Sequence, residues 1–403
     1  MTIAILGGGS VGCAAALELA RAGHDVALFE SREDILLGAS RVNEGKIHQG
    51  FIYAKDDPER TARKMAEGAV EFHRLLARWV DTGEALRLST PFLYALHRAS
   101  QLTAAQLEAH FQRCCDIFDE VRNARNADYL GSDEPAGFSK MARDEVEALI
   151  NPDHITTVYR TTEKGVDPRA VADALSQAVR KEPRITVRSG TRVTKVSRRS
   201  GRGFDIHTSQ DGCDGPFDQV INATWESRLE IDAAMGIAPP KSYSLRHKYG
   251  HRVRIRLAPC DLPSLTTVLG PFGDIVNFGD GGFYLSWYPR GMTFMTTSAG
   301  VGPDWHEIDR AERLENFHSS REVWQELCPK LGELSYTEDD VDPTSGLIYA
   351  LGDTDIDDLD SQLHTRHEVG VTSLDGYHTV NTGKFTLFPL MAMTVSSRVL
   401  GIA

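Results

Sequence analysis

The first thirty residues run from a strand through a glycine-rich turn and a helix into a second strand that ends on an acid. Residues 2–6 are apolar, and glycines follow at positions 7, 9 and 12 in the pattern G-x-G-x-x-G. The pattern in this context is typical of a dinucleotide-binding fold: the glycines permit a tight turn, a close approach of the backbone to a pyrophosphate, and close helix–strand packing. The start of the helix offers free N–H groups to phosphates. Glu30 stands where an acid accepts hydrogen bonds from ribose hydroxyls, which disfavours NADP.

Length, charge and cysteine spacing limit the class of protein. The 403 residues suffice for two domains, and a net charge of −13 offers no basic field for nucleic acid or an anionic membrane. We expect no membrane span, since no apolar run approaches the roughly 20 residues that one needs. Because the fingerprint begins at residue 3, we expect no signal peptide ahead of it. Six scattered cysteines without zinc spacing predict reduced thiols, a cytoplasmic location and no metal site.

Helical and β-rich stretches follow one another along the rest of the chain. Apolar periodicity predicts helices over 59–80, 103–125 and 143–150, and a further helix that begins at Pro168 with Asp167 as its N-cap. Strands are predicted at 184–188, 191–196, 204–207 and 219–223, and residues 245–300 are strongly β-patterned, as at 252–257 and 283–288. We therefore predict an α/β protein, in which a Rossmann-like dinucleotide domain carries an inserted, β-rich domain of mixed sheet and helices.

A second glycine-containing loop precedes a helix near the C-terminus. Residues 381–386 lead into the apolar run 387–393. A loop of this kind directs backbone N–H groups at an anion or a polarised carbonyl. In a flavoprotein that group would be the N1–C2=O edge of the reduced isoalloxazine. An ordinary helix cap is the alternative interpretation.

Four groups of residues, spread over nearly the whole chain, carry a resemblance to a known family. They are 7–12 with Glu30; 38–53 with its I-H-x-G-x-x-Y motif; 166–168 with 191–196 and 220–223; and 345–347 with 382–386. Together they resemble the D-amino-acid-oxidase-type (glutathione-reductase-like) FAD-dependent oxidoreductases, near the glycerol-3-phosphate and L-2-hydroxyglutarate dehydrogenases.

The resemblance implies an enzyme with FAD as its cofactor. A discontinuous FAD-binding domain would comprise 1–80, 151–230 and 336–403, and a substrate-binding domain 81–150 and 231–335. The enzyme would oxidise a small-molecule secondary alcohol, hydroxy acid or amine by hydride transfer to flavin N5. With a single dinucleotide fingerprint, electrons should pass to oxygen or another non-nicotinamide acceptor. A homo-oligomer is possible.

Two other functions stay open. One is an FAD monooxygenase-type enzyme, although the late loop at 381–386 does not match the G-D-A-A-H type that such enzymes carry. The other is a flavin-binding subunit without catalysis.

The resemblance also implies the site residues. His48 is the first catalytic candidate, because an imidazole near the flavin can take the substrate proton, and Tyr53 would orient the substrate. His48 matches the histidine that tethers FAD in dimethylglycine-dehydrogenase-like members, so a covalent link and a core histidine are alternatives. Lys384 would stabilise the anionic reduced flavin. The residues expected at the cofactor are Gly7, Gly9, Ser10, Val11, Gly12, Glu30, Ser31, Ser40, Arg41, His48, Val193, Ala223, Trp225, Gly383, Lys384, Phe385 and Thr386.

Two positions depart from the family's pattern. Enzymes of the glycerol-3-phosphate type carry arginines in their G-G-x-R-Y and G-L-R-P segments, where this sequence has Ile52 and Ile348. Without these bidentate clamps, we expect glycerol-3-phosphate and small 2-hydroxy acids to be poor substrates. Arg246 and the arginines at 252–256 could replace the clamps, although alternation along a strand usually directs such residues to solvent.

Overall fold

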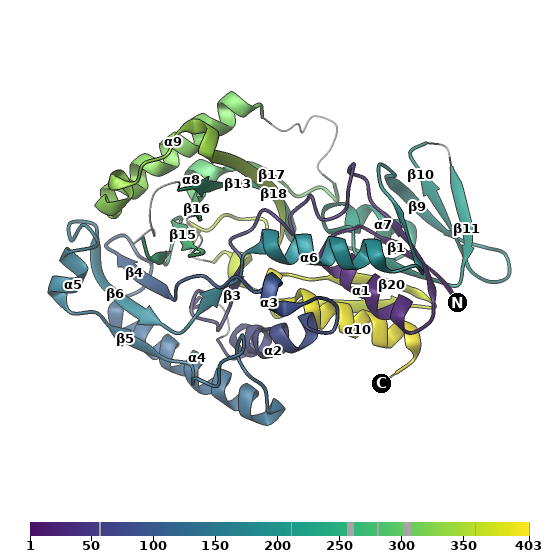
Figure 1. Cartoon of the computed structure of the whole chain (residues 1–403), viewed down its shortest axis with the longest axis horizontal. Coiled ribbons are helices and arrows are strands. Elements are labelled where there is room, and N and C mark those ends of the chain that lie inside the picture. The colour runs from purple at the N-terminus through teal and green to yellow at the C-terminus, as the bar shows by residue number, and fades with distance from the viewer. Residues whose placement is uncertain are drawn as a thin grey trace.

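The computed structural model describes residues 1–55, 58–210, 212–255, 262–279, 282–300, 308–358 and 360–402. Within these ranges the chain is an α/β protein built on two large sheets, which lie toward the right and toward the left of Figure 1. Its helices are α1 Ser10–Arg21, α2 Pro58–Leu76, α3 Thr82–Ala85, α4 Ala104–Arg125, α5 Arg143–Glu147, α6 Pro168–Lys181, α7 Arg228–Ala234, α8 Tyr288–Gly291, α9 Arg310–Leu327 and α10 Phe388–Leu400. None of these helices is long and apolar enough to cross a membrane.

The first sheet has six strands in the order β19-β20-β12-β1-β2-β8, and β1 is parallel to both of its neighbours. Its strands are β1 Thr2–Leu6, β2 Asp25–Phe29, β8 Ile185–Arg188, β12 Gln219–Asn222, β19 Gly370–Leu374 and β20 Tyr377–Asn381. Side chains of β1 alternate between two cores: Ile3 and Ile5 pack with α1 and α10, whereas Ala4 and Leu6 pack with a three-stranded sheet. That sheet comprises β9 Val193–Arg198, β10 Phe204–Thr208 and β11 Cys213–Phe217. Burial on both faces explains the uninterrupted apolar run of β1.

The second sheet has nine strands, in the order β17-β13-β16-β15-β14-β4-β6-β5 with β18 paired to β13. They are β4 Phe92–His97, β5 Phe138–Lys140, β6 Ile155–Thr161, β13 Tyr243–Arg254, β14 Ser264–Val268, β15 Gly273–Asn277, β16 Gly282–Trp287, β17 Met292–Thr296 and β18 Val341–Leu351. One face buries Phe283 and Leu285 against Trp324 of α9. On the other face, Tyr94 packs against Phe111 of α4. A short pair, β3 Lys46–Ile47 and β7 Lys164–Gly165, joins antiparallel beside the sheets.

The predicted fold class is confirmed, and the differences lie at the ends of elements. Helix α2 ends at Leu76 instead of residue 80, and α5 ends at Glu147 instead of 150. Helix α6 begins as predicted, since the Asp167 side chain accepts a hydrogen bond from the Arg169 N–H. Strand β13 begins at Tyr243, nine residues before the predicted strand at 252–257, because its charged residues are buried and hide the alternation. Residues 256 and 257 of that prediction lie outside the described part of the chain.

The division into two domains stays a prediction. Two strands from stretches assigned to the cofactor domain, β6 and β18, pair within the nine-stranded sheet. The backbone therefore crosses between the two sheets several times. These crossings bring distant parts of the sequence to the space between the sheets.

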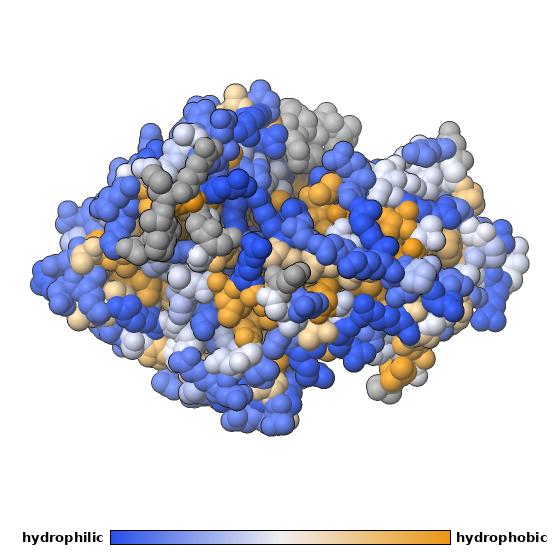
Figure 2. Space-filling view, in the orientation of Figure 1, coloured by the Kyte–Doolittle hydropathy of each residue, from blue (hydrophilic) through white to orange (hydrophobic). Residues whose placement is uncertain are grey.

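The face drawn in Figure 2 is mostly hydrophilic over α4, α6 and α9. This surface agrees with a charged-residue content of 25% and a net charge of −13. Apolar residues on this face gather in small groups between hydrophilic ones.

Candidate active site

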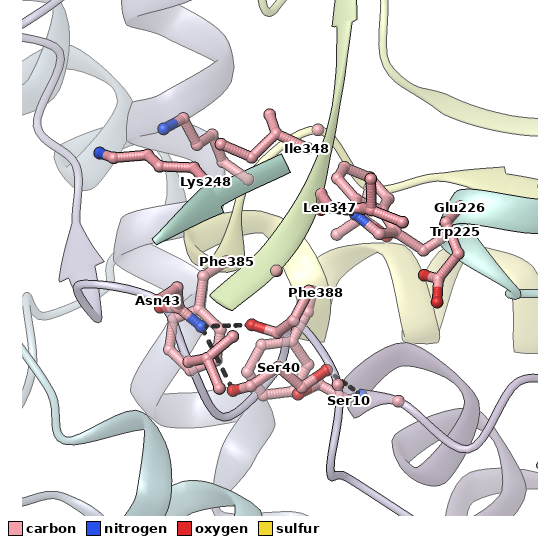
Figure 3. A pocket seen from close by; sticks show the side chains of 18 of the residues that line it. Ser10, Ser40, Asn43, Trp225, Glu226, Lys248, Leu347, Ile348, Phe385 and Phe388 are labelled. Atoms are coloured by element: carbon pink, nitrogen blue, oxygen red, sulfur yellow. Dashed lines mark hydrogen bonds between the residues drawn. The ribbon is translucent and has the colours of Figure 1, made fainter. Parts of the chain in front are cut away.

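A cavity of about 370 Å³ runs along the ends of the strands in the first sheet and under the second. Its lining comes from the glycine turn after β1, the loop 36–53, the ends of β2 and β12, and strands β13 and β18. Figure 3 shows Ser10 and Ser40 on one side, with Lys248 and Ile348 at the strands above. In parallel sheets, ligands bind at the carboxyl ends of the strands.

The glycine turn has the geometry that the sequence predicts. Gly7 has φ +96°, and a Cβ there would lie 2.5 Å from the Ala223 carbonyl oxygen. A Cβ on Gly12 would lie 1.9 Å from the Gly7 carbonyl oxygen, so α1 packs directly on the turn. Gly9 precedes α1 without any side-chain cap, which leaves the helix start open toward the cavity. The Ser40 hydroxyl accepts a hydrogen bond from the Ser10 N–H at 2.9 Å.

The acid predicted for ribose binding is fixed at the end of β2. Oε2 of Glu30 accepts a hydrogen bond from the Gly8 N–H at 2.8 Å, and Oε1 accepts one from the Arg32 N–H at 2.8 Å. The Ser31 hydroxyl donates to the same Oε1 at 3.1 Å. Glu226 lines the same end of the cavity, and burial raises the pKa of its carboxyl group.

His48 lies inside the cavity wall and is 3% exposed. The backbone N–H of His48 donates to the Thr386 hydroxyl at 3.0 Å, and that hydroxyl donates to the Lys46 carbonyl at 3.0 Å. Its Nδ1 lies 3.9 Å from Oε1 of Glu163, a fully buried carboxyl group. Burial lowers the pKa of His48 well below its ordinary value, and Lys384 and Lys46 lower it further. The imidazole is therefore neutral near pH 7 and able to accept a proton.

Tyr53 packs edge-on against His48, with ring centroids 5.2 Å apart. Its hydroxyl is buried without a hydrogen-bond partner in the described part of the chain. Burial raises the pKa of the phenol well above its ordinary value, so it stays protonated.

Lys384 and Glu44 form an ion pair in the cavity lining, with Nζ 3.7 Å from Oε1. Burial lowers the pKa of Lys384, and Glu44 offsets part of that effect. Burial alone would raise the pKa of Glu44, but Lys384, Lys248 and Lys46 outweigh it and lower the pKa to about 2. Glu44 is therefore ionised and keeps a charge partner beside Lys384.

The structure adds cationic residues that the sequence did not single out. Nζ of Lys46 lies 2.6 Å from the Thr266 hydroxyl and 2.9 Å from Oδ1 of Asp274, over the ring of Phe92 at 4.3 Å. Lys248 on β13 also lines the cavity. Neither lysine has a sequence signature of its own; the pairing of distant strands brings them here.

Arg246 lies directly opposite Ile348 in the pairing of β13 with β18. Its side chain is only 1% exposed, so the expectation that alternation sends it to solvent is wrong. Its Nη1 is 2.6 Å from Oδ1 of Asp355 and donates to the Tyr288 hydroxyl at 2.8 Å. The guanidinium is thus already bound by Asp355 and Tyr288, so it does not replace the arginine that related enzymes carry at the position of Ile348. The nearby Arg252 pairs with Asp167 and also leaves the position of Ile348 uncharged.

Most of the expected cofactor residues line this cavity. They are Gly7, Gly9, Ser10, Val11, Glu30, Ser31, Ser40, His48, Val193, Ala223, Trp225, Gly383, Lys384 and Phe385. Three do not: Gly12 packs under the turn, Thr386 is buried behind His48, and Arg41 forms an ion pair with Asp173. Contact of the lining residues with the cofactor stays a prediction.

The fold, the glycine turn and Glu30 at the end of β2 are those of a dinucleotide-binding protein. The chain belongs to the DAO family of FAD dependent oxidoreductases, whose family model matches residues 2–396. The resemblance seen in the sequence and the assignment of FAD as cofactor are therefore confirmed.

Individual relatives are distant. Glycerol 3-phosphate oxidase of Mycoplasma pneumoniae (strain ATCC 29342 / M129 / Subtype 1) is 22% identical over 209 residues, which cover 52% of this chain and 50% of that protein. The match thus spans about half the length of this curated relative. Glycine oxidase from Geobacillus kaustophilus has a TM-score of 0.70 at 16% identity, covering 100% of this chain and 95% of its own. Iminodiacetate oxidase from Chelativorans sp. BNC1 has a TM-score of 0.70 at 16% identity, and the match covers 100% of this chain and 96% of that protein's chain. These structural matches show the shared fold.

The cavity fits FAD at both of its ends. At the glycine turn, the Ser10 hydroxyl is buried without a hydrogen-bond partner among the described residues, beside the open start of α1. A diphosphate there would satisfy this hydroxyl and the helix N-terminus. Glu30 would hold the ribose, and Lys384 would lie beside the flavin ring.

Proposed function

We propose that this enzyme oxidises a secondary alcohol group of a small polyhydroxylated acid, such as a sugar acid, and not of a short 2-hydroxy acid. When bound, FAD supplies the hydride acceptor at flavin N5. The observation that carries the proposal is the charge of the cavity away from the glycine turn. The cations there are Lys46, Lys248, Lys384 and Arg366, together with Arg246, which is already paired with Asp355; the carboxylates that line this part of the cavity are Glu44 and Asp274.

The pairing of these charges favours an anionic substrate. Lys46 is paired with Asp274, and Lys384 with Glu44. Lys248 adds a cation whose Nζ lies 5.9 Å from the centroid of the Tyr288 ring. A substrate carboxylate would lower the electrostatic energy of this arrangement, whereas an ammonium group would raise it.

His48 is the proposed proton acceptor. The neutral imidazole would take the hydroxyl proton of the substrate as the hydride leaves. The carboxylate of Glu163, 3.9 Å from Nδ1, would then face the imidazolium. Tyr53 would orient the hydroxyl group from beside His48.

The electron acceptor is proposed to be oxygen or another non-nicotinamide compound. A nicotinamide site of the same type would need a second glycine turn between a parallel strand and a helix. The glycines at 273 and 282 instead begin β15 and β16, which are antiparallel to each other.

Three sugars that differ in charge test the proposal. We expect anaerobic glucuronate to bleach the bound flavin at least about tenfold faster than glucose, and glucose faster than glucosamine, because the cavity favours a negative charge. The measurement is the decay of flavin absorbance at equal concentrations, with glycine and iminodiacetate as amine controls. Preferred bleaching by glucosamine or by an amine control, or none by any hydroxylated acid, would contradict the proposal.

The same assay tests the effect of the two positions at which this sequence has isoleucine and the related enzymes have arginine. Glycerol-3-phosphate and L-2-hydroxyglutarate are expected to reduce the flavin poorly or not at all, because Ile52 and Ile348 offer no bidentate contact. Fast bleaching by either at millimolar concentration would show that other cations have replaced the arginines.

A further inference from the structure

Three neighbouring side chains on the cavity wall each carry a buried polar atom that has no hydrogen-bond partner among the described residues. These atoms are Nδ1 of His48, the hydroxyl of Tyr53 and Nε2 of His364. The Tyr53 ring contacts both of the other two, with its centroid 5.2 Å from that of His48 and 6.3 Å from that of His364. We propose that His364 is a substrate-contacting residue, which together with His48 and Tyr53 binds neighbouring hydroxyl groups of the substrate. The inference rests on the proposed function and adds a residue that no sequence motif marks.

Unsatisfied buried groups are costly and therefore rare in folded proteins. Lys46 and Arg246 at this cavity have partners within the protein, since Lys46 bonds to Thr266 and Asp274 and Arg246 bonds to Asp355, whereas the hydroxyls of Ser10 and Thr267 have none among the described residues. The atoms of His48, Tyr53 and His364 differ from these two hydroxyls because they belong to rings that contact one another. A ligand that supplies their hydrogen bonds explains why the fold keeps them.

The protonation of the three groups points to hydroxyls as their ligands. Burial lowers the pKa of His364 to about 3, and Arg366, Lys384 and Lys55 contribute to the lowering. His48 is likewise neutral, and Tyr53 is protonated. A neutral imidazole and a phenol each have one donor and one acceptor. Hydroxyl groups also donate and accept, whereas a carboxylate only accepts and an ammonium only donates.

The segment that carries His364 is held against the second sheet. His364 ends a short helical turn, Gln362–His364, in the loop that follows β18. Arg246 binds Oδ1 of Asp355 and the Thr354 carbonyl in the same loop. Leu363 and Ile356 of this loop also line the cavity. His364 is therefore positioned by the fold and is not exposed on a loose segment.

The first test compares His364→Leu and Tyr53→Phe with Tyr94→Phe in the holoenzyme without substrate. Tyr94 is the matched control, because its hydroxyl donates to Glu163 inside the fold. We expect His364→Leu and Tyr53→Phe to keep or raise the melting temperature, and Tyr94→Phe to lower it by about 2 °C or more. A fall in both test variants as large as that of Tyr94→Phe would overturn the inference, since the atoms would then have partners in the protein.

The second test measures binding of glucuronate from the change in flavin absorbance. We expect His364→Leu to weaken binding about tenfold or more, and the KM for glucuronate to rise further than kcat falls. Unchanged binding in His364→Leu, or no binding by the wild type, would overturn the inference. Binding of glucuronate without bleaching of the flavin would instead contradict the proposed function but would not contradict the role of His364. The two failures are therefore distinguishable.

Discussion

Replacing Gly9 with aspartate is expected to abolish FAD binding and leave a colourless, folded protein. Gly9 stands at the open start of α1, and its Cβ would lie 3.1 Å from the Ser40 hydroxyl. The new carboxylate would meet the FAD diphosphate in a poorly solvated turn. Two like charges about 4 Å apart repel by about 4 kcal/mol near a protein surface, which weakens binding by roughly 10³-fold. Titration with FAD, followed by absorbance, measures the loss.

Two variants separate charge from shape in this experiment. Gly9→Ala adds the Cβ without the charge and should lose much less affinity. Gly332→Asp adds a carboxylate at an exposed site, where the nearest atom to its Cβ is the flexible Gln325 Nε2 at 3.2 Å. It should bind FAD like the wild type. Normal FAD binding by Gly9→Asp would show that the turn does not hold the diphosphate.

Replacing His48 with alanine is expected to leave FAD bound but slow flavin reduction by roughly 10²- to 10⁴-fold, the usual share of a general acid–base group. The measurement is anaerobic stopped-flow reduction by the best substrate of the panel. His251→Ala is the matched control, because His251 is equally buried and bonds to Asn316 away from the cavity lining. It should cost stability and leave the reduction rate unchanged.

The alternatives for His48 give different results. If His48 tethers the flavin, acid precipitation of the wild type should leave FAD in the pellet, and His48→Ala should release it. If it only fills the core, His48→Ala should lower stability at an unchanged reduction rate. We expect FAD in the supernatant for both proteins. A wild-type rate in His48→Ala would remove His48 from the mechanism.

The depressed pKa of His48 has a consequence for the pH profile. Burial, Lys384 and Lys46 favour the neutral imidazole, so the base form persists as the pH falls through 6.5. The acid limb of kcat/KM that belongs to His48 should therefore lie well below pH 6.5 in the wild type. Its loss in His48→Ala would accompany the slower reduction.

The sequence predicts the parts of the fold that depend on local pattern. The turn from β1 to α1 needs glycine at positions where a Cβ would strike Ala223 or Gly7, and such positions are readable from the sequence. Strand β13 lies in the β-patterned stretch 245–300, but its bounds were not predicted, because its charged residues, such as Arg246, are buried by partners from distant segments. Long-range pairing of this kind leaves no periodic pattern.

The residues of the site divide in the same way, into those that local motifs predict and those that long-range strand pairing brings together. Glu30, His48 and Lys384 lie in motifs that are contiguous in the sequence, and all three line the cavity. Lys248 and His364 were not predicted, because the pairing of β13 with β18 and the loop after β18 bring them there. Arg41 was expected at the cofactor from the family resemblance, but its side chain pairs with Asp173. The preceding residue, Ser40, lines the cavity, so neighbouring residues of one loop can face different ways.

The ratio of FAD to polypeptide in the purified protein tests the central claim most directly. The protein is incubated with FAD, freed of unbound cofactor, and its absorbance spectrum is compared with the protein concentration. We predict a yellow protein with about one FAD per chain, held at the glycine turn of residues 7–12 and at Glu30. A protein that stays colourless after this treatment would contradict the assignment of the cavity to FAD and every step built on it.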